Sequence, residues 1–401
     1  MTESRIGPNT VAGITLPVLL AASLCHLLND LMQSVFTATY PLIKSDFGLT
    51  FAQVGFLTLT YQLSASILQP LIGLYTDRRP MPYSLPFASA FSMAGIFALS
   101  IAPSYEMLLL GGALLGVGSS IFHPEASRVA RIAAGKSHGL AQSIFQVGGN
   151  LGSSLGPLLV VFIVLPGGLS AMRWFCLSAL TAMIFLIGIS RWYAQNLPAH
   201  AQGQGHAHHA LSPRRVWAAI LVLTLLMLSK TFYLASFDSF YQFYLMEKFE
   251  VSAEDAQLCL FGFLAAVAAG TLVGGPVGDR IGRKKVLWAS ILGVLPFTLA
   301  LPYVSLSMTV VLSLVIGFIM ASAFSAIVVF AQSLVPHRIG MISGVFFGLL
   351  FGFGGIGAAI VGALADYSSI EQVYKLCAFL PAMGLLTYFL PETDAGSRSG
   401  G

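Results

Sequence analysis

Four polar side chains interrupt an otherwise apolar run between Leu16 and Ile43. They are spaced i, i+3, i+4 and i+7, at His26, Asn29, Asp30 and Gln33. On a helix this spacing places all four on one face. Asp30 follows His26 by one turn, so its carboxylate can hold an imidazolium or exchange a proton with it. We predict that Asp30, assisted by His26, carries a proton; for Asn29 and Gln33, ligand binding and hydrogen bonding between helices both stay open.

A second polar group lies between His123 and Arg128. Glu125 and Arg128 are three residues apart and are therefore neighbours on a helix. His123 precedes Pro124, whose missing N–H loosens a helix. The pattern predicts a second polar centre, with His123 and Glu125 as further proton carriers and Arg128 as a site for an anionic ligand. Snorkelling of the arginine to a membrane surface is the alternative for Arg128.

Three amide side chains are spaced by four residues further along, at Gln142, Gln146 and Asn150. On a helix they face the same side and can hydrogen-bond a polar substrate. Contact between helices is the alternative.

A lysine and an aspartate share another apolar segment, at Lys230 and Asp238, with Tyr233 and Phe237 between them. A lysine in an apolar environment needs an anion. The anion is either Asp238, which makes a structural pair, or the substrate, which we favour. For Tyr233 and Phe237 we predict at most a wall of the binding cavity.

The composition identifies the environment of these groups. The chain has 401 residues, of which 56% are apolar and 9% are charged, whereas soluble domains have about 25% charged residues. We predict an all-α integral membrane protein. An ionisable group inside a span costs about 2.5–3.5 kcal/mol, so these groups should face a cavity and serve a function. No nucleic-acid partner is expected, because the net charge of +4 is spread through short loops.

No catalytic or metal-binding motif is found. The four cysteines lack metal-site spacing, and the sequence contains no nucleophile elbow or nucleotide-binding loop. We therefore predict no enzymatic activity, no metal and no cofactor.

Twelve apolar segments are long enough to be spans, at residues 16–43, 51–76, 83–102, 106–130, 139–165, 170–190, 216–245, 256–278, 285–304, 308–334, 340–365 and 372–390. An even number places both termini on one side. If that side is the cytoplasm, fifteen of the twenty Lys and Arg residues lie inside, as the positive-inside rule requires. Residues 195–215 are rich in Gly, Pro and His and predict a flexible cytoplasmic linker between a bundle at 1–194 and a bundle at 216–401.

The two halves repeat each other. With a shift of 202 residues, Gly73, Asp77 and Arg78 correspond to Gly275, Asp279 and Arg280. Such repetition predicts two related six-helix bundles with a site between them, an arrangement suited to alternating access. We predict that the repeated aspartates latch one conformation by contacting a helix N-terminus or a basic loop.

The repeated stretches that begin at Gly73 and Gly275 resemble a sequence motif of a known family. The stretch GPVGDRIGRK from Gly275, which includes Gly282 and Arg283, is similar to the signature loop of the major facilitator superfamily. The first copy is similar up to Arg78, before Pro80 and Pro82 interrupt it. The resemblance implies twelve transmembrane helices in two pseudo-symmetric six-helix bundles.

A narrower resemblance covers nearly the whole chain. The stretches SLCHLLNDLMQS, SIFHPEASRVAR and HGLAQSIFQVGGNLGSSLGP look like those of the bacterial fosmidomycin-resistance exporters. The resemblance implies an exporter in the bacterial inner membrane that expels small anionic phosphonates by proton antiport. We also predict that the protein is a monomer. Proton-coupled uptake or exchange of a phosphorylated or organic-anion metabolite is the alternative. The fifth span has Val160 and Val161 where drug antiporters usually have glycines, so coupling residues cannot be copied from distant antiporters.

Overall fold

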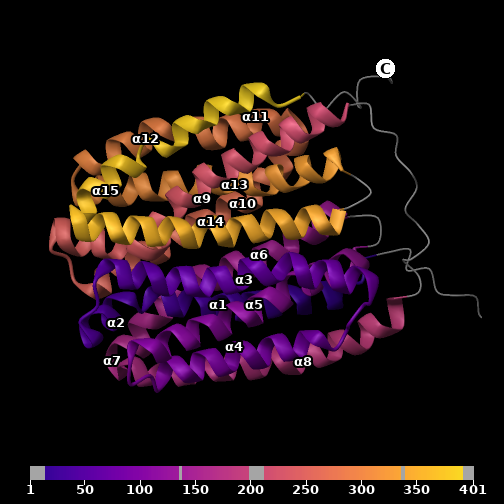
Figure 1. Ribbon diagram of the computed structural model, residues 1–401, viewed down its shortest axis with the longest axis horizontal. Helices are drawn as coiled ribbons and strands as arrows, with labels where there is room; N and C mark the ends of the chain where they lie inside the picture. Colours follow the sequence, from indigo (N-terminus) through magenta and orange to yellow (C-terminus); the bar gives the residue numbers. More distant parts are fainter. Residues whose placement is uncertain (1–13, 135–137, 198–211, 336–338, 392–401) are drawn as a thin grey trace, which may run out of the picture.

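The computed structural model describes residues 14–134, 138–197, 212–335 and 339–391, and this part of the chain contains helices and no strands (Figure 1). The described part of the first half forms six helical rods. They are α1 (Leu16–Ala38) continued by α2 (Tyr40–Phe47), α3 (Phe51–Arg78), α4 (Ser84–Ser100), α5 (Tyr105–Ala133), α6 (His138–Leu159) continued by η1 (Val160–Val164) and α7 (Leu165–Gly167), and η2 (Leu169–Phe175) continued by α8 (Cys176–Asn196).

The second half repeats this arrangement. Its rods are α9 (Pro213–Phe249), α10 (Ala253–Ile281), a broken rod of α11 (Arg283–Leu287), η4 (Trp288–Leu292), α12 (Leu295–Ala300) and η5 (Leu301–Tyr303), then α13 (Leu306–Leu334), α14 (Ile339–Tyr367), and α15 (Ile370–Cys377) continued by η7 (Leu380–Phe389). The predicted segments therefore correspond one by one to the rods of the described chain.

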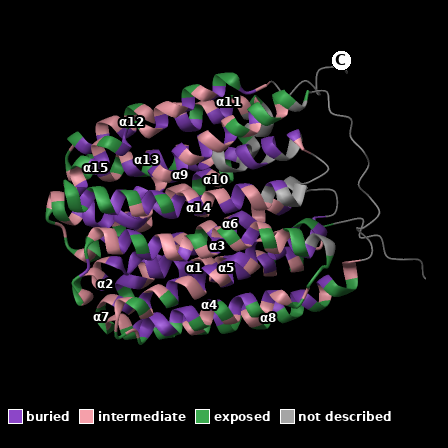
Figure 2. Ribbon diagram, in the orientation of Figure 1, coloured by how far each residue is buried: buried purple, intermediate pink, exposed green. Residues whose placement is uncertain are grey.

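Many large apolar side chains are exposed on the outside of the described helices. Within the described residues, eight helices are long and apolar enough to cross a membrane, and Ser84–Ser100 and Leu306–Ser322 are shorter apolar helices. Phe162, Trp217 and Phe389 are exposed, whereas His26, Glu125 and Lys230 are buried. Figure 2 shows exposed residues along the outer sides of the helices and buried residues between the helices. Polar groups inside and apolar groups outside are what a lipid environment requires.

The halves meet along α3 and α14, and along α6 and α10. At the end of the molecule that contains α2 and α15, one hydrophobic cluster includes residues of both halves, such as Phe36 and Phe237. At the opposite end, where α1 and α9 begin, the clusters around Phe122 and around Phe330 each lie within one half. The halves are thus packed together at the α2–α15 end and have separate cores at the other.

Close helix contact explains the tight packing at the α2–α15 end. A Cβ atom at Gly362 of α14 would overlap the carbonyl oxygen of Phe51 on α3, whereas a Cβ atom at Gly344 would lie 3.8 Å from Pro70. The two helices therefore approach most closely at this end and diverge towards the other.

Hydrogen bonds between the halves reinforce the same end. The carboxylate of Asp366, at the end of α14, accepts hydrogen bonds from the backbone N–H groups of Phe51 (2.9 Å) and Ala52 (2.7 Å) at the start of α3. These are two of the donors that a helix N-terminus leaves unpaired, and the helix dipole favours a negative charge there. Gln257 of α10 likewise donates to the carbonyl of Ala38 at the end of α1 (2.5 Å).

We predict that Asp366→Ala loosens this end. Losing a helix cap costs about 0.5–2 kcal/mol, so the variant should melt at a lower temperature. A cysteine replacing Thr58, which is buried between α3 and α9, should also react faster with a thiol reagent in a background without the native cysteines. Glu254→Ala, which removes an exposed carboxylate, is the control. Unchanged melting and labelling would contradict a role for Asp366 in holding the halves together.

Candidate functional site

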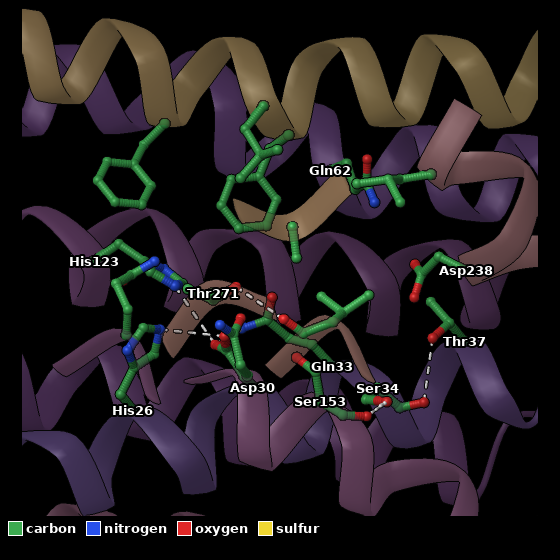
Figure 3. Close-up of a pocket in the computed structure, with 18 of the residues that line it drawn as sticks. His26, Asp30, Gln33, Ser34, Thr37, Gln62, His123, Ser153, Asp238 and Thr271 are labelled. Carbon is green, nitrogen blue, oxygen red and sulfur yellow. Dashed lines mark hydrogen bonds and ion pairs between the residues drawn. The ribbon is translucent and has the colours of Figure 1, made fainter. Parts of the chain in front are cut away.

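A cavity of about 240 Å³ lies between the two halves (Figure 3). Its walls come from α1, α3, α5 and α6 of the first half and from α9, α10, α13 and α14 of the second. Eight residues that the sequence singled out line it: His26, Asp30, Gln33, His123, Gln146, Asn150, Lys230 and Asp238. Groups from four separate segments are thus brought to one space.

Asp30 is the centre of a group of donors. Its carboxylate lies 3.2 Å from Nε2 of His26, one turn earlier on α1, and 3.5 Å from Nε2 of His123, which comes from α5 (Figure 3). The amides of Asn29 and Gln33 also donate to it, at 3.0 and 3.3 Å. The sequence predicted the pairing with His26, and the tertiary structure adds His123.

The hydrogen bonds at Nδ1 indicate which ring nitrogen of each imidazole carries a proton. Nδ1 of His26 lies 2.8 Å from the carbonyl oxygen of Phe145, and Nδ1 of His123 lies 2.9 Å from that of Ser119. A carbonyl oxygen can only accept, so both Nδ1 atoms carry a proton and donate it. Each contact between Nε2 and the carboxylate then needs one further proton, held by the imidazole or by Asp30. The arrangement can therefore take up and release protons next to the cavity.

The same three side chains could hold a metal ion. One ligand atom each from His26, Asp30 and His123 lies within 4.8 Å of the others. Imidazoles that donate their second N–H to a backbone carbonyl are typical of metal ligands. Either protons or a metal ion can therefore occupy the His26–Asp30–His123 centre, and treatment with a chelator distinguishes the two.

Lys230 and Asp238 project from one face of α9. Lys230, Leu234 and Asp238 are spaced by four residues and all line the cavity. Lys230 is only 2% exposed, so its ammonium group lies deep inside the molecule. Eight residues of helix rise about 12 Å, and no ion pair joins Lys230 to Asp238. The structure therefore shows no ion pair between Lys230 and Asp238, and a substrate anion stays a prediction for Lys230.

Other predicted residues lie away from the cavity. Arg128 pairs with Glu125 at 3.3 Å and donates to the carbonyl of Thr76 at 2.7 Å and to the hydroxyl of Tyr193 at 3.3 Å. This places the Glu125–Arg128 pair among α3, α5 and α8. The pair joins these helices and is not part of the cavity wall.

Four further residues pack between helices. Gln142 accepts a hydrogen bond from Ser127, and Asn29 accepts one from Ser92 besides donating to Asp30. Tyr233 and Phe237 belong to the hydrophobic cluster that joins the halves. Successive residues turn by 100° around a helix, so these two lie beside the face of α9 that carries Lys230 and Asp238.

The charged side chains of the predicted latch lie outside what the structure describes. Only the backbone of the latch and two of its glycines, Gly73 and Gly282, are described. The side chains of Asp77, Arg78, Asp279, Arg280 and Arg283 are not described, nor is Gly275 beyond its place in α10. Gly73 lies in α3, and Gly282 separates α10 from α11 with φ of 95°, a conformation that favours glycine. The linker histidines also lie outside the described residues.

The sequence interpretation missed several lining residues, among them Ser34, Thr37, Tyr61, Gln62, Ser153 and Thr271. Ser34 and Thr37 continue the stripe of α1 by one and two turns beyond Asp30, so helical spacing could have found them. Tyr61 and Gln62 lie in α3, where nothing in the sequence marks the cavity side. Tyr61 donates to Gln33 at 2.5 Å and so orders one of the donors to Asp30.

Family models and known proteins match most of the chain. The family model described as Major Facilitator Superfamily matches residues 22–241 and 223–400. The fosmidomycin resistance protein of Escherichia coli (strain K12) is 57% identical, covering 96% of this chain and 95% of that protein. An uncharacterized MFS-type transporter of Bacillus subtilis (strain 168) is 41% identical, covering 94% and 93%.

The fold is also similar to that of solved structures. A bacterial homolog of the human lysosomal transporter Spinster, in an inward-facing and unoccupied conformation, superposes with a TM-score of 0.68. The identity is 17%, and the match covers 94% of each chain. At this identity the comparison establishes the fold alone.

Proposed function

The chain belongs to the major facilitator superfamily, and from this membership we propose that it exports fosmidomycin and related small anionic compounds in exchange for protons. Transport across a membrane follows from the family and from the 57% identical relative. One observation carries the finer proposal: the cavity between the halves contains both a buried lysine and the His26–Asp30–His123 centre. The lysine suits an anion, and the centre suits protons.

The two groups are proposed to act on each other through charge. Lys230 binds the anionic group of the substrate in a poorly solvated cavity, where charge–charge interactions are strong. Loss or gain of one proton at Asp30 and its imidazoles changes the charge of the same cavity by one unit. Proton occupancy and substrate affinity therefore depend on each other, as a coupled transporter requires.

In the proposed transport cycle the two halves move relative to each other, so that the cavity opens alternately at one end of the molecule and at the other. The separate cores at the end where α1 and α9 begin support access from that end, and the Asp366 contact supports closure at the other. In the opposite state the Asp366 contact is broken, and the ends of α3 and α10, which carry the duplicated Asp77 and Asp279, close the first end. Glu125 and Arg128 hold α5 to α3 and α8 during this movement.

Everted membrane vesicles test the direction. With an acid interior, vesicles that contain the protein should accumulate labelled fosmidomycin, and collapsing the gradient should release it. Accumulation only with the gradient reversed would indicate proton-coupled uptake. Exchange between labelled and unlabelled anions without any proton dependence would indicate an exchanger, and an absence of flux would reject fosmidomycin as a substrate.

We further propose that both termini and the linker are cytoplasmic and that the monomer is the working unit. The charge asymmetry of the loops supports this orientation. A cysteine placed at Gly205 in the linker, in a background without the native cysteines, should resist impermeant thiol reagents in intact cells and react after permeabilisation. Rapid labelling in intact cells would reverse the topology.

A further inference from the structure

Asp238 is a carboxylate in the cavity that the proposed coupling does not use. It is half-buried on α9, and it forms no hydrogen bond or ion pair with any residue that the structure describes. Figure 3 draws it on the side of the cavity where Thr37 lies, away from His26, Asp30 and His123. Gln242, one turn further along α9, donates to the carbonyl of Thr37 at 3.5 Å, which brings this part of α9 close to the end of α1. A carboxylate inside a membrane protein is costly unless a partner compensates its charge.

The neighbouring hydroxyl groups do not supply that partner. The hydroxyl of Ser34 donates to the carbonyl of Ser153 at 2.5 Å, and that of Thr37 donates to the carbonyl of Ser34 at 3.2 Å. Each hydroxyl has one proton, so these oxygens can only accept further hydrogen bonds.

Two side-chain amides add to the excess of acceptors. The Oε1 atoms of Gln62 and Gln146 are buried in the cavity wall and accept no hydrogen bond within the described chain. Buried acceptors without a donor are unfavourable, and a ligand that brings donors would satisfy them.

The cavity thus has two complementary parts on one wall. Lys230 and Asp238 lie on the same face of α9 with Leu234 between them, two helical turns or about 12 Å apart along the axis. A cation at one level and a group of acceptors at the other match a small molecule with opposite charges at its ends.

We propose that Asp238, with the Ser34 and Thr37 oxygens, forms a subsite for a protonated amine, so that the preferred ligands are small zwitterions whose anionic group binds Lys230. The assignment of the anionic end rests on the proposed function. The ammonium group has three donors, which suits one carboxylate and two hydroxyl oxygens. Gln62 and Gln146 then discriminate among ligands by accepting from further N–H or O–H groups.

Two phosphonates that differ only in the amine test this subsite. Binding of 3-aminopropylphosphonate and of propylphosphonate is measured by calorimetry on the full-length protein in lipid nanodiscs. The wild type should bind the amine at least about tenfold more tightly, since a hydrogen bond to a charged group contributes about 1.5–3 kcal/mol. Asp238→Asn should abolish this preference and leave propylphosphonate binding unchanged, whereas Asp46→Asn, at an exposed position in α2, should alter neither.

The outcomes separate the two proposals. Equal binding of both phosphonates by the wild type, or equal weakening of both by Asp238→Asn, overturns the amine subsite while the anion site stands. A preference that survives in Asp238→Asn together with a shifted pH dependence of transport makes Asp238 a proton site instead. If the wild type binds neither compound, the anion site at Lys230 fails and this inference fails with it.

Discussion

Asp30→Asn should abolish proton-driven accumulation of fosmidomycin in everted vesicles, while exchange of the drug down its own gradient should continue. Asparagine nearly keeps the shape of the side chain, but its amide does not take up or release a proton near neutral pH. The two contacts between imidazole Nε2 atoms and the carboxylate then lose the group that links them. We expect the ratio of internal to external drug to fall to about one under an imposed gradient, because coupling is lost and passage is not.

Both activities are measured in the same vesicle preparation, so a folding defect would be seen as a loss of exchange. Asp46→Asn serves as the matched control, because Asp46 is an exposed aspartate outside the cavity. If Asp30→Asn still accumulates drug with the normal pH dependence, the proton is carried elsewhere. Glu125, which is fully buried beside Arg128, would then be the first candidate.

A chelator distinguishes protons from a metal at the same centre. EDTA treatment of the purified protein before reconstitution should leave accumulation unchanged. Loss of transport on chelation and recovery on adding one divalent metal would show that His26, Asp30 and His123 hold an ion.

Lys230→Gln should weaken fosmidomycin binding by at least about thirtyfold without unfolding the protein. Removing one partner of a buried charge pair costs about 2 kcal/mol or more, which is roughly a thirtyfold loss of affinity. Lys230 is nearly inaccessible and lines the cavity, so few other groups can replace its charge. Binding is measured by calorimetry in nanodiscs and folding by thermal melting.

Lys248→Gln is the matched control, because Lys248 lies outside the cavity and contacts the Tyr244 hydroxyl and the carbonyl of Pro302. It should bind the drug as the wild type does. Normal binding by Lys230→Gln combined with a lowered melting temperature would assign Lys230 a structural role.

The fold and half of the site were accessible from the sequence. Lengths of apolar chain and the repeat at a shift of 202 residues predict the helices and their two groups, because a span needs about 20 apolar residues in lipid. The stripe of α1 was also predictable, since helical spacing decides which side chains share a face. His26, Asp30 and Gln33 all reach the cavity, and Asn29, at the edge of the stripe, turns towards Ser92.

Only the tertiary structure decided which faces meet. Spacing places His123 and Glu125 on one helix but gives neither the rotation of α5 nor its neighbours, so it could not show that His123 faces Asp30 while Arg128 reaches Thr76. Lipid and protein interior are both apolar, so hydrophobicity distinguishes weakly between an outward and an inward face. By itself the sequence determined the spans, the repeat and the presence of buried charges. The packing of two bundles, which depends on close fit between particular side chains, determined that Asp30, His123, Lys230 and Asp238 share one cavity.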